Sequence, residues 1–225
     1  MHPPVIRVVA RMALRLSILV VPFLAAGRAD WGNGWLLAAL SVANIAVNLP
    51  VVYKRNPEVI KLRMQPIRPK KGFDQIFVAA GLVLFLCGLI VAGLDSGRHG
   101  WSRMSWEWTV LGVGMYIAGM VPVVCSLVVN KFLDTTVSIQ RERGHRVVST
   151  GPYRIVRHPM YSGLLLVYLS FPLILGSWWA FIPMGLMPPL LVFRTAKEDA
   201  TLRAELAGYE QFTQQTRYRL IAGVW

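Results

Sequence analysis

Residues 161–193, YSGLLLVYLSFPLILGSWWAFIPMGLMPPLLVF, contain no charged side chain. One straight helix of this length would measure about 50 Å at a rise of about 1.5 Å per residue, whereas the hydrocarbon core of a bilayer is about 30 Å thick. Pro172, the pair Gly176-Ser177 and the pair Pro188-Pro189 interrupt the stretch. The pattern therefore predicts a helical hairpin that turns near residues 176–179 and continues as a helix past Arg194.

Four other apolar stretches precede this hairpin. Residues 77–94 and 108–129 carry no charge and are long enough to cross a membrane, and residues 35–53 are also uncharged. Residues 16–27 are short and would cross only if Arg11 and Arg15 extend toward the headgroups. A signal peptide is the competing interpretation of this start, but a clear small-x-small cleavage site is missing. We therefore predict an all-α, polytopic integral membrane protein with about six transmembrane helices, and a single domain over residues 1–225.

Composition and charge agree with a membrane protein. Hydrophobic residues make up 55% of the chain and charged residues only 16%, although the formal net charge is +13. Connections between successive spans lie alternately on the two sides of the membrane. Of the 24 lysines and arginines, 21 fall on one side, and only Arg28, Arg98 and Arg103 fall on the other. The positive-inside rule then predicts that both termini are cytoplasmic. Nucleic-acid binding is not indicated, because no basic and aromatic recognition module accompanies the charge.

Two polar segments, residues 130–159 and 194–225, flank the hairpin, which must bring them together at one membrane surface. They belong to a predicted catalytic region, residues 130–225, that follows the spans of residues 1–129. The first segment leads into GPYRIVRHPMYSG, residues 151–163. His158 in this run is either a polar residue at the level of the lipid headgroups or part of a functional site. A zinc site is not indicated, because neither His145 nor a cysteine stands at ligand spacing from His158.

In the second segment, Arg194 and Glu198 lie four residues apart and share one helix face. They form either a surface ion pair or a pair in which each side chain holds the other in place while both face a pocket. Asp199 lies about 100° further round the helix, so it need not act with Glu198. The tail around Tyr209 and Arg217 could close over a ligand or lie on the membrane as an amphipathic helix. Motifs of Rossmann domains, zincins and α/β-hydrolases are absent from the sequence.

The run of residues 151–163, followed after the hairpin by Arg194, Glu198-Asp199 and Gly208-Tyr209, resembles the isoprenylcysteine carboxyl methyltransferase family. Related phospholipid methyltransferases share this plan. The resemblance covers residues 130–225, and more weakly residues 56–58 and 71–74. It implies S-adenosylmethionine bound without a Rossmann fold, in a cytoplasm-facing pocket formed by the loop before the hairpin, the helix after it and the tail.

The resemblance also implies roles for single residues. The reacting end would contain Arg194 and Glu198, and Gly163 would let the helix backbone approach the ligand closely. Relatives often carry a second glutamate where this chain has Asp199. The positions carried over as cofactor-binding are Arg157, His158, Pro159, Tyr161, Gly163, Tyr209 and Arg217.

The function implied is methyl transfer to a lipidic or small apolar acceptor that enters from the bilayer, with no metal required. A carboxylate acceptor is favoured, because Arg194 could bind it through two parallel hydrogen bonds. One alternative is an NADPH-dependent enzyme of the sterol-reductase type, against which His158-Pro159 argues. The other is a membrane scaffold without catalytic activity.

Overall fold

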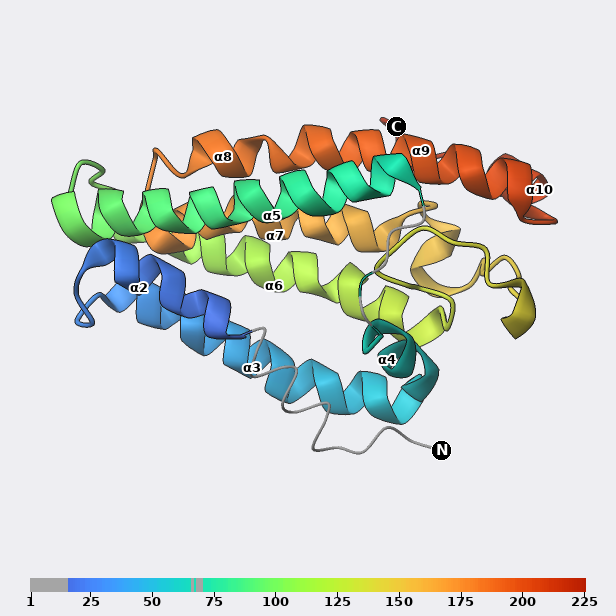
Figure 1. The fold of residues 1–225 in the computed structure, drawn as a ribbon, viewed down its shortest axis with the longest axis horizontal. Helices are drawn as coiled ribbons and strands as arrows, with labels where there is room; N and C mark the ends of the chain where they lie inside the picture. The colour runs from blue at the N-terminus through green and yellow to red at the C-terminus, as the bar shows by residue number, and fades with distance from the viewer. Residues whose placement is uncertain (1–15, 66, 68–70) are drawn as a thin grey trace.

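The computed structural model describes residues 16–65, 67 and 71–225. This part of the chain is helical and contains no strand, as predicted. Arg11 and Arg15, on which the first predicted span depends, lie outside the described residues. Figure 1 shows the long helices running side by side along one axis. The elements in chain order are η1 (Ser17–Leu19), α2 (Val20–Ala26), α3 (Gly32–Arg55), α4 (Pro57–Arg63), α5 (Gly72–Ala92), η2 (Gly93–His99), α6 (Trp106–Val129), η3 (Arg141–Arg143), η4 (Gly151–Arg154), α7 (Pro159–Leu175), α8 (Phe181–Gly185), α9 (Met187–Glu205) and α10 (Tyr209–Gln215).

Three helices are long and apolar enough to cross a membrane. They are α3, α5 together with its π-helical continuation η2, and α6. These helices contain the predicted spans of residues 35–53, 77–94 and 108–129. The segment Ser17–Ala26 and helix α7 are also apolar but shorter. The helix lengths and their composition are those of a membrane protein.

The predicted hairpin is present. Helix α7 ends at Gly176, whose φ of 71° reverses the chain, and α9 then continues past Arg194 to Glu205. The hydroxyl of Ser177 donates to Asp95 Oδ2 at 2.6 Å, and the backbone N–H of Ser102 donates to Asp95 Oδ1 at 2.7 Å. These bonds to a fully buried carboxylate attach the turn to the connection between α5 and α6.

Glycines allow α6 and α7 to pack closely. A Cβ atom added at Gly163 would lie 2.2 Å from the carbonyl oxygen of Gly119, and one added at Gly119 would lie 2.6 Å from the carbonyl oxygen of Gly163. Side chains larger than hydrogen would therefore push the helices apart. The close backbone approach expected at Gly163 thus occurs toward α6, which corrects the prediction that it occurs toward a ligand.

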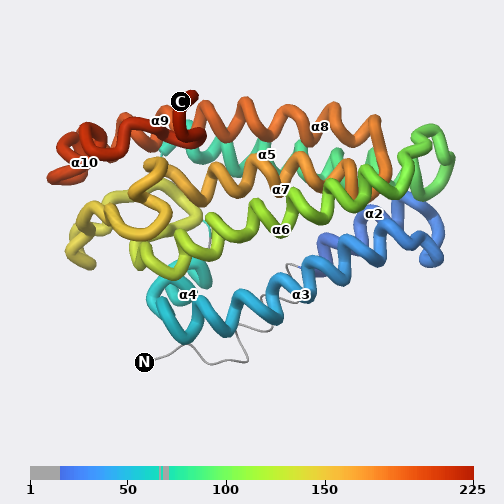
Figure 2. Tube along the Cα trace, turned by 180° about the vertical axis from the view of Figure 1, so that it is seen from behind, coloured from blue at the N-terminus to red at the C-terminus, as the bar shows by residue number. Residues whose placement is uncertain are grey.

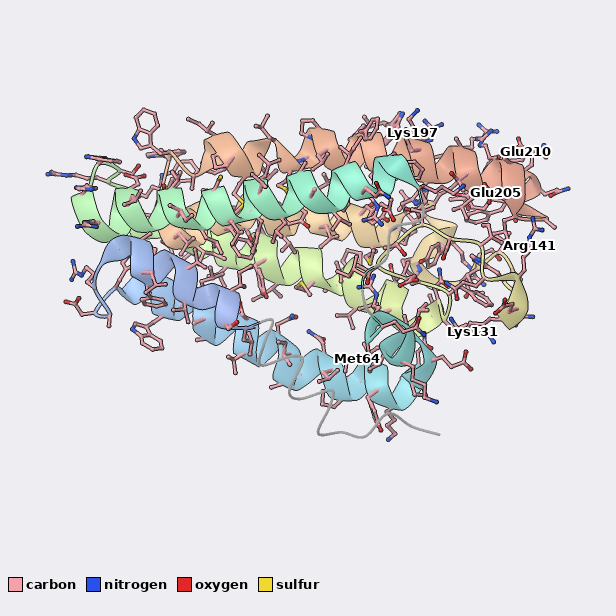
Figure 3. The ribbon with its side chains drawn as sticks, viewed as in Figure 1. Met64, Lys131, Arg141, Lys197, Glu205 and Glu210 are labelled. Atoms are coloured by element: carbon pink, nitrogen blue, oxygen red, sulfur yellow. The ribbon has the colours of Figure 1, made fainter. Side chains whose placement is uncertain are left out.

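Both views place the polar segments at one end of the bundle. Helix α4, the loop after α6 and α10 lie together there, while the turn between α7 and α8 lies at the opposite end (Figures 1 and 2). Lys131, Arg141 and Glu210 are found at the same polar end (Figure 3). The hairpin therefore brings residues 130–159 and 194–225 together, as the sequence predicted.

Candidate active site

A cleft at the polar end lies between the loop after α6, the start of α7, α9 and α10. Its cavity volume is about 80 Å³, and the wider hollow around it, which includes open solvent, measures about 750 Å³. Its wall combines apolar side chains such as Leu202, Leu206 and Phe212 with charged ones such as Asp134 and Arg146. Most of the predicted site residues line it as well, namely Arg157, His158, Tyr161, Arg194, Glu198 and Tyr209.

The carboxylate of Asp199 is the centre of a buried polar cluster beside this cleft. Arg157 donates to it through Nε at 2.8 Å and Nη2 at 3.1 Å, and Arg219 donates through Nε at 3.0 Å. The hydroxyl of Tyr209 donates to Oδ1 at 2.9 Å, and His158 Nε2 lies 3.4 Å from the same oxygen. We call these five residues the Asp199 cluster.

The charges of this cluster determine its protonation. Burial alone would raise the pKa of Asp199, but hydrogen bonds from His158 and Arg157 outweigh it and hold the pKa well below its usual range. Burial and the adjacent negative charge of Asp199 raise the pKa of Tyr209. The carboxylate of Asp199 therefore stays ionised. Tyr209 keeps its proton and donates a hydrogen bond to this carboxylate.

Arg157 also fixes the C-terminal tail. Its Nη1 donates to the carbonyl oxygens of Thr216 at 2.9 Å and Arg217 at 2.6 Å. The backbone N–H groups of Arg157 and His158 each donate to a tail carbonyl at 2.9 Å. Since the side chain of Arg157 is almost fully buried, its main observed task is to connect the tail to Asp199.

Arg194 forms its ion pair with a residue that lies far away in the sequence. Its Nη2 lies 2.9 Å from Asp74 Oδ1 and donates to the carbonyl oxygen of Thr135 at 2.7 Å. The guanidinium also lies over the ring of Phe77, 4.2 Å from its centroid. Among the described residues no hydrogen bond or ion pair joins Arg194 to Glu198. The predicted direct pairing of these two neighbours is therefore wrong, because Asp74 of α5 makes the direct contact. The negative charge of Glu198 still acts on Arg194 from a distance and, against the effect of burial, helps to raise its pKa.

One donor and one acceptor in this pair lack a hydrogen-bond partner. Arg194 Nε and Asp74 Oδ1 are buried and unsatisfied within the described part of the chain, and the contact between Asp74 and Arg194 Nη2 lacks hydrogen-bond geometry. Leaving such a group unpaired costs about 1–3 kcal/mol. An unpaired N–H on a residue that lines the cleft is therefore a position where a ligand could supply an acceptor.

Glu198 faces the cleft from the next turn of α9. It is half-buried, and its Oε2 accepts a hydrogen bond from the hydroxyl of Tyr161 at 2.6 Å. The ring of Tyr161 is parallel to the ring of His158, at an interplanar angle of 1° and a centroid distance of 5.8 Å. A carboxylate beside aromatic rings is an environment that favours a cation.

The loop after α6 forms the opposite wall of the cleft. Phe132 is buried and stacks on His145, with ring centroids 4.6 Å apart. The backbone N–H of Gln140 donates to His145 Nδ1 at 3.3 Å, which requires an unprotonated nitrogen. Burial and the nearby charge of Arg143 lower the pKa of His145 and keep this nitrogen available.

Three predicted residues do not reach the cleft with their side chains. Pro159 is the first residue of α7 and is buried, where its ring suits the start of a helix. Gly163 contacts α6, as described above. Arg217 is exposed, and it is its backbone carbonyl that binds Arg157.

Two residues of the candidate site escaped the sequence reasoning. Asp199 was set aside because it lies on a different helix face from Glu198, yet its burial among cationic side chains makes it the centre of the cluster. Asp74 lies on another helix, and the weak resemblance of residues 71–74 was the only signal that pointed to it. Neither contact can be derived from spacing within α9.

One family of known proteins matches part of this chain. The family model of phospholipid methyltransferases matches residues 108–204, which extend from the start of α6 to the end of α9. The predicted resemblance to membrane methyltransferases is thus confirmed over this range, which includes the hairpin, Arg157 and Glu198. A search of curated proteins gave no match.

Proposed function

We propose that this methyltransferase-family protein uses S-adenosylmethionine as its methyl donor, and that the cleft at the polar end is its active site. The match of residues 108–204 supports methyltransferase activity in general. The observation that carries the choice of cofactor is the position of Glu198, half-buried in the cleft and hydrogen-bonded to Tyr161 beside a stacked histidine ring.

The residues of the cleft fit the three parts of this cofactor. A sulfonium cation is favoured near Glu198 and the rings of Tyr161 and His158. The apolar side chains of Leu206 and Phe212 offer a surface for a flat base. When bound, S-adenosylmethionine would supply an electrophilic methyl group on a positively charged sulfur.

The protein's own side chains would align the partners and exclude water. Glu198 holds the hydroxyl of Tyr161, and the unsatisfied Nε of Arg194 is a donor that an acceptor carboxylate could use. Arg157 and Asp199 hold the C-terminal tail against the cleft. Alignment and dehydration are the main requirements of an in-line displacement.

We also propose how the chain lies in the membrane. Three long apolar helices, the short segment Ser17–Ala26 and the two arms of the hairpin would give six crossings. The distribution of lysine and arginine supports cytoplasmic termini, with the cleft on the cytoplasmic side. A lipidic acceptor would then reach the cleft from the bilayer while the donor arrives from the cytoplasm.

Binding of radiolabelled S-adenosylmethionine to the purified protein in nanodiscs tests this proposal. We expect saturable binding that excess NADPH does not displace, and transfer of label into a lipid extract. Displacement by NADPH would favour a reductase, and absence of both binding and transfer would favour a scaffold. Either result would overturn the proposal.

Variants in the cleft test the site itself. Glu198→Gln and Arg194→Lys should each reduce turnover by about a hundredfold or more if they act at the reacting end. Lys197→Gln is a matched control, because Lys197 lies on the same helix but is exposed. Unchanged turnover in both cleft variants, or an equal loss in the control, would contradict the assignment.

A further inference from the structure

Asp74 is a fully buried carboxylate in the first turn of α5. It does not itself line the cleft, whereas its partner Arg194 does. Burial of a carboxylate is costly unless an opposite charge and hydrogen bonds compensate for it. A charge that is buried next to the cleft, but not in it, can act on a ligand only through the side chains that it contacts.

Asp74 and Arg194 both hold the loop after α6. The backbone N–H of Val137 donates to Asp74 Oδ2 at 2.9 Å, and the carbonyl oxygen of Thr135 accepts from Arg194 Nη2 at 2.7 Å. The two bonds fall two positions apart in a loop that forms one wall of the cleft. The ion pair therefore fixes this wall as well as the arginine.

Helix α5 also fixes the plane of the guanidinium. Phe77, three residues after Asp74, lies on the same face of α5, and its ring centroid is 4.2 Å from the guanidinium carbon of Arg194. The ring centroid of Tyr161 lies 5.5 Å from the same carbon. Nη2 contacts Asp74 and Thr135, whereas Nε has no hydrogen-bond partner within the described part of the chain. The contacts from α5 thus hold the arginine and leave one of its donors unused.

Without this counter-charge, Arg194 would have another carboxylate within reach. Glu198 lies four residues further along α9 on the same face, which is the spacing of a helical ion pair. Its negative charge already acts on Arg194. In the structure, its Oε2 instead accepts a hydrogen bond from Tyr161 at 2.6 Å. A direct pair between Arg194 and Glu198 would neutralise the carboxylate and occupy the donors of the arginine at the same time.

We propose that Asp74 is a positioning residue that holds Arg194 away from Glu198, so that each of these side chains stays available to a different ligand. This inference rests on the proposed function. Glu198 then keeps its negative charge for the sulfonium of the donor, and Arg194 keeps a hydrogen-bond donor for the methyl acceptor. Asp74 touches neither ligand and acts only through Arg194.

Donor affinity tests this role through a rescue. Radiolabelled S-adenosylmethionine is titrated into nanodiscs that contain the wild type, Asp74→Asn, Arg194→Gln or the double variant. We expect Asp74→Asn to weaken binding about tenfold, because Arg194 turns to Glu198 and neutralises it. Arg194→Gln should leave binding within about twofold of the wild type, and the double variant should regain the wild-type affinity.

A failure of the rescue would overturn the positioning role. If Asp74 were needed only for the fold, the double variant would bind the donor at least as poorly as Asp74→Asn. Asp74→Ser replaces Asp74→Asn in the same cycle if the asparagine variant does not fold, since its small side chain leaves room for water next to the N–H of Val137.

Glu58→Gln is the matched control, because Glu58 holds the same loop from α4. Its Oε2 binds Arg143 Nη2 at 3.1 Å, and 50% of its side chain is exposed. An exposed pair of this kind contributes little, so donor affinity should stay within about twofold of the wild type. A loss as large as that of Asp74→Asn would mean that loosening of the loop explains both variants, and it would overturn the inference.

Stability gives a readout that does not depend on the donor. Thermal unfolding in detergent measures the effect of Glu198→Gln in the wild-type and in the Asp74→Asn background. We expect no change in the midpoint in the first background and a fall of about 2–4 °C in the second, where Arg194 and Glu198 have paired. An equal effect in both would overturn the inference. Wild-type protein that binds no S-adenosylmethionine, in a chain that shows this coupling, would contradict the proposed function and not the effect of Asp74 on Arg194.

Discussion

At the scale of single residues, two adjacent carboxylates of α9 have different surroundings. Glu198 lines the cleft and contacts Tyr161, whereas Asp199 is fully buried among Arg157, His158 and Arg219. The rotation of about 100° between neighbours on a helix separates them. Under the proposed function, Glu198 would act at the cleft, whereas Asp199 holds the C-terminal tail through Arg157 and Arg219.

This difference predicts opposite consequences of removing each charge. Asp199→Asn leaves the buried guanidinium of Arg157 without its counter-charge, so we expect a loss of about 3–5 kcal/mol in the free energy of unfolding. Glu198→Gln should leave stability nearly unchanged and reduce turnover. Denaturant unfolding of the protein in detergent, combined with donor binding, measures both effects.

An exposed pair provides the control for this experiment. Glu205 binds Lys71 at the surface, with 41% and 29% of the side chains exposed, and Glu205→Gln should cost less than about 1 kcal/mol. If Asp199→Asn were as stable as Glu205→Gln, the Asp199 cluster would not hold the tail in the way described.

A second residue-scale prediction concerns pH. The folded loop lowers the pKa of His145 below its ordinary value of 6.5, so an open loop binds a proton that the closed loop does not. The loop is therefore fully stabilised above pH 6.5 and loses protection as the pH falls below that value. Hydrogen exchange of residues 131–148, expressed as protection factors from pH 7.5 to 5.5, should show this decline.

The variant His145→Gln removes the titrating group but keeps a side-chain oxygen as an acceptor for the N–H of Gln140. Its loop should have protection factors that do not change over the same pH range. A decline identical to that of the wild type would assign the pH dependence to another group.

The sequence predicted which residues lie together at the cleft better than it predicted their partners. Arg157, His158 and Tyr161 stand in one recognisable run, so their position in the cleft followed from motif and hairpin together. The partner of Arg194 did not follow, because Asp74 comes from α5. Charge pairing between distant helices depends on how they pack, and a single sequence contains no direct record of that.

At the scale of elements, hydropathy predicted the helices but not their contacts. The uncharged length of residues 161–193 and its prolines predicted the turn at Gly176, where the structure has it. The same pattern says nothing about which face of α7 meets α6. That face is marked by glycine, whose lack of a side chain has two possible uses, and the structure shows helix packing.

Substitution of these glycines separates the two uses. In Gly163→Ala the new Cβ atom would meet the carbonyl oxygen of Gly119, so we expect a loss of about 1–3 kcal/mol in stability from overpacking. Gly114→Ala on α6 is the control, because nothing lies within 4 Å of its Cβ position. It should be neutral or slightly stabilising.

Thermal unfolding in detergent compares the two variants, and donor affinity is measured below their unfolding temperatures. A folded Gly163→Ala protein should bind S-adenosylmethionine about as well as the wild type. Full stability together with lost donor binding would show that Gly163 contacts the ligand after all, contrary to the packing described here.

At the scale of the whole molecule, polar chemistry is confined to one end of an apolar bundle. The turn at Ser177 and the buried Asp95 close the other end, where Arg28, Arg98 and Arg103 are the basic residues of the predicted outer connections. Charge along the sequence was sufficient to predict this separation, because it alternates with the apolar stretches. The direction in which the bundle faces stays a prediction of the positive-inside rule.

Cysteine accessibility tests that direction and the number of crossings together. In a Cys87→Ser, Cys125→Ser background, single cysteines are introduced at exposed positions and treated with a membrane-impermeant maleimide in intact cells. Six crossings with cytoplasmic termini predict two groups. The sites that should react in intact cells are Asp30, Arg103 and Trp179, and those that should react only after permeabilisation are Lys54, Arg141 and Glu210. Reaction of Glu210→Cys in intact cells would mean that the hairpin crosses once, which would separate the tail from Arg157 and contradict the cleft. Protection of Asp30→Cys alone would remove the first crossing and leave the proposed active site unchanged.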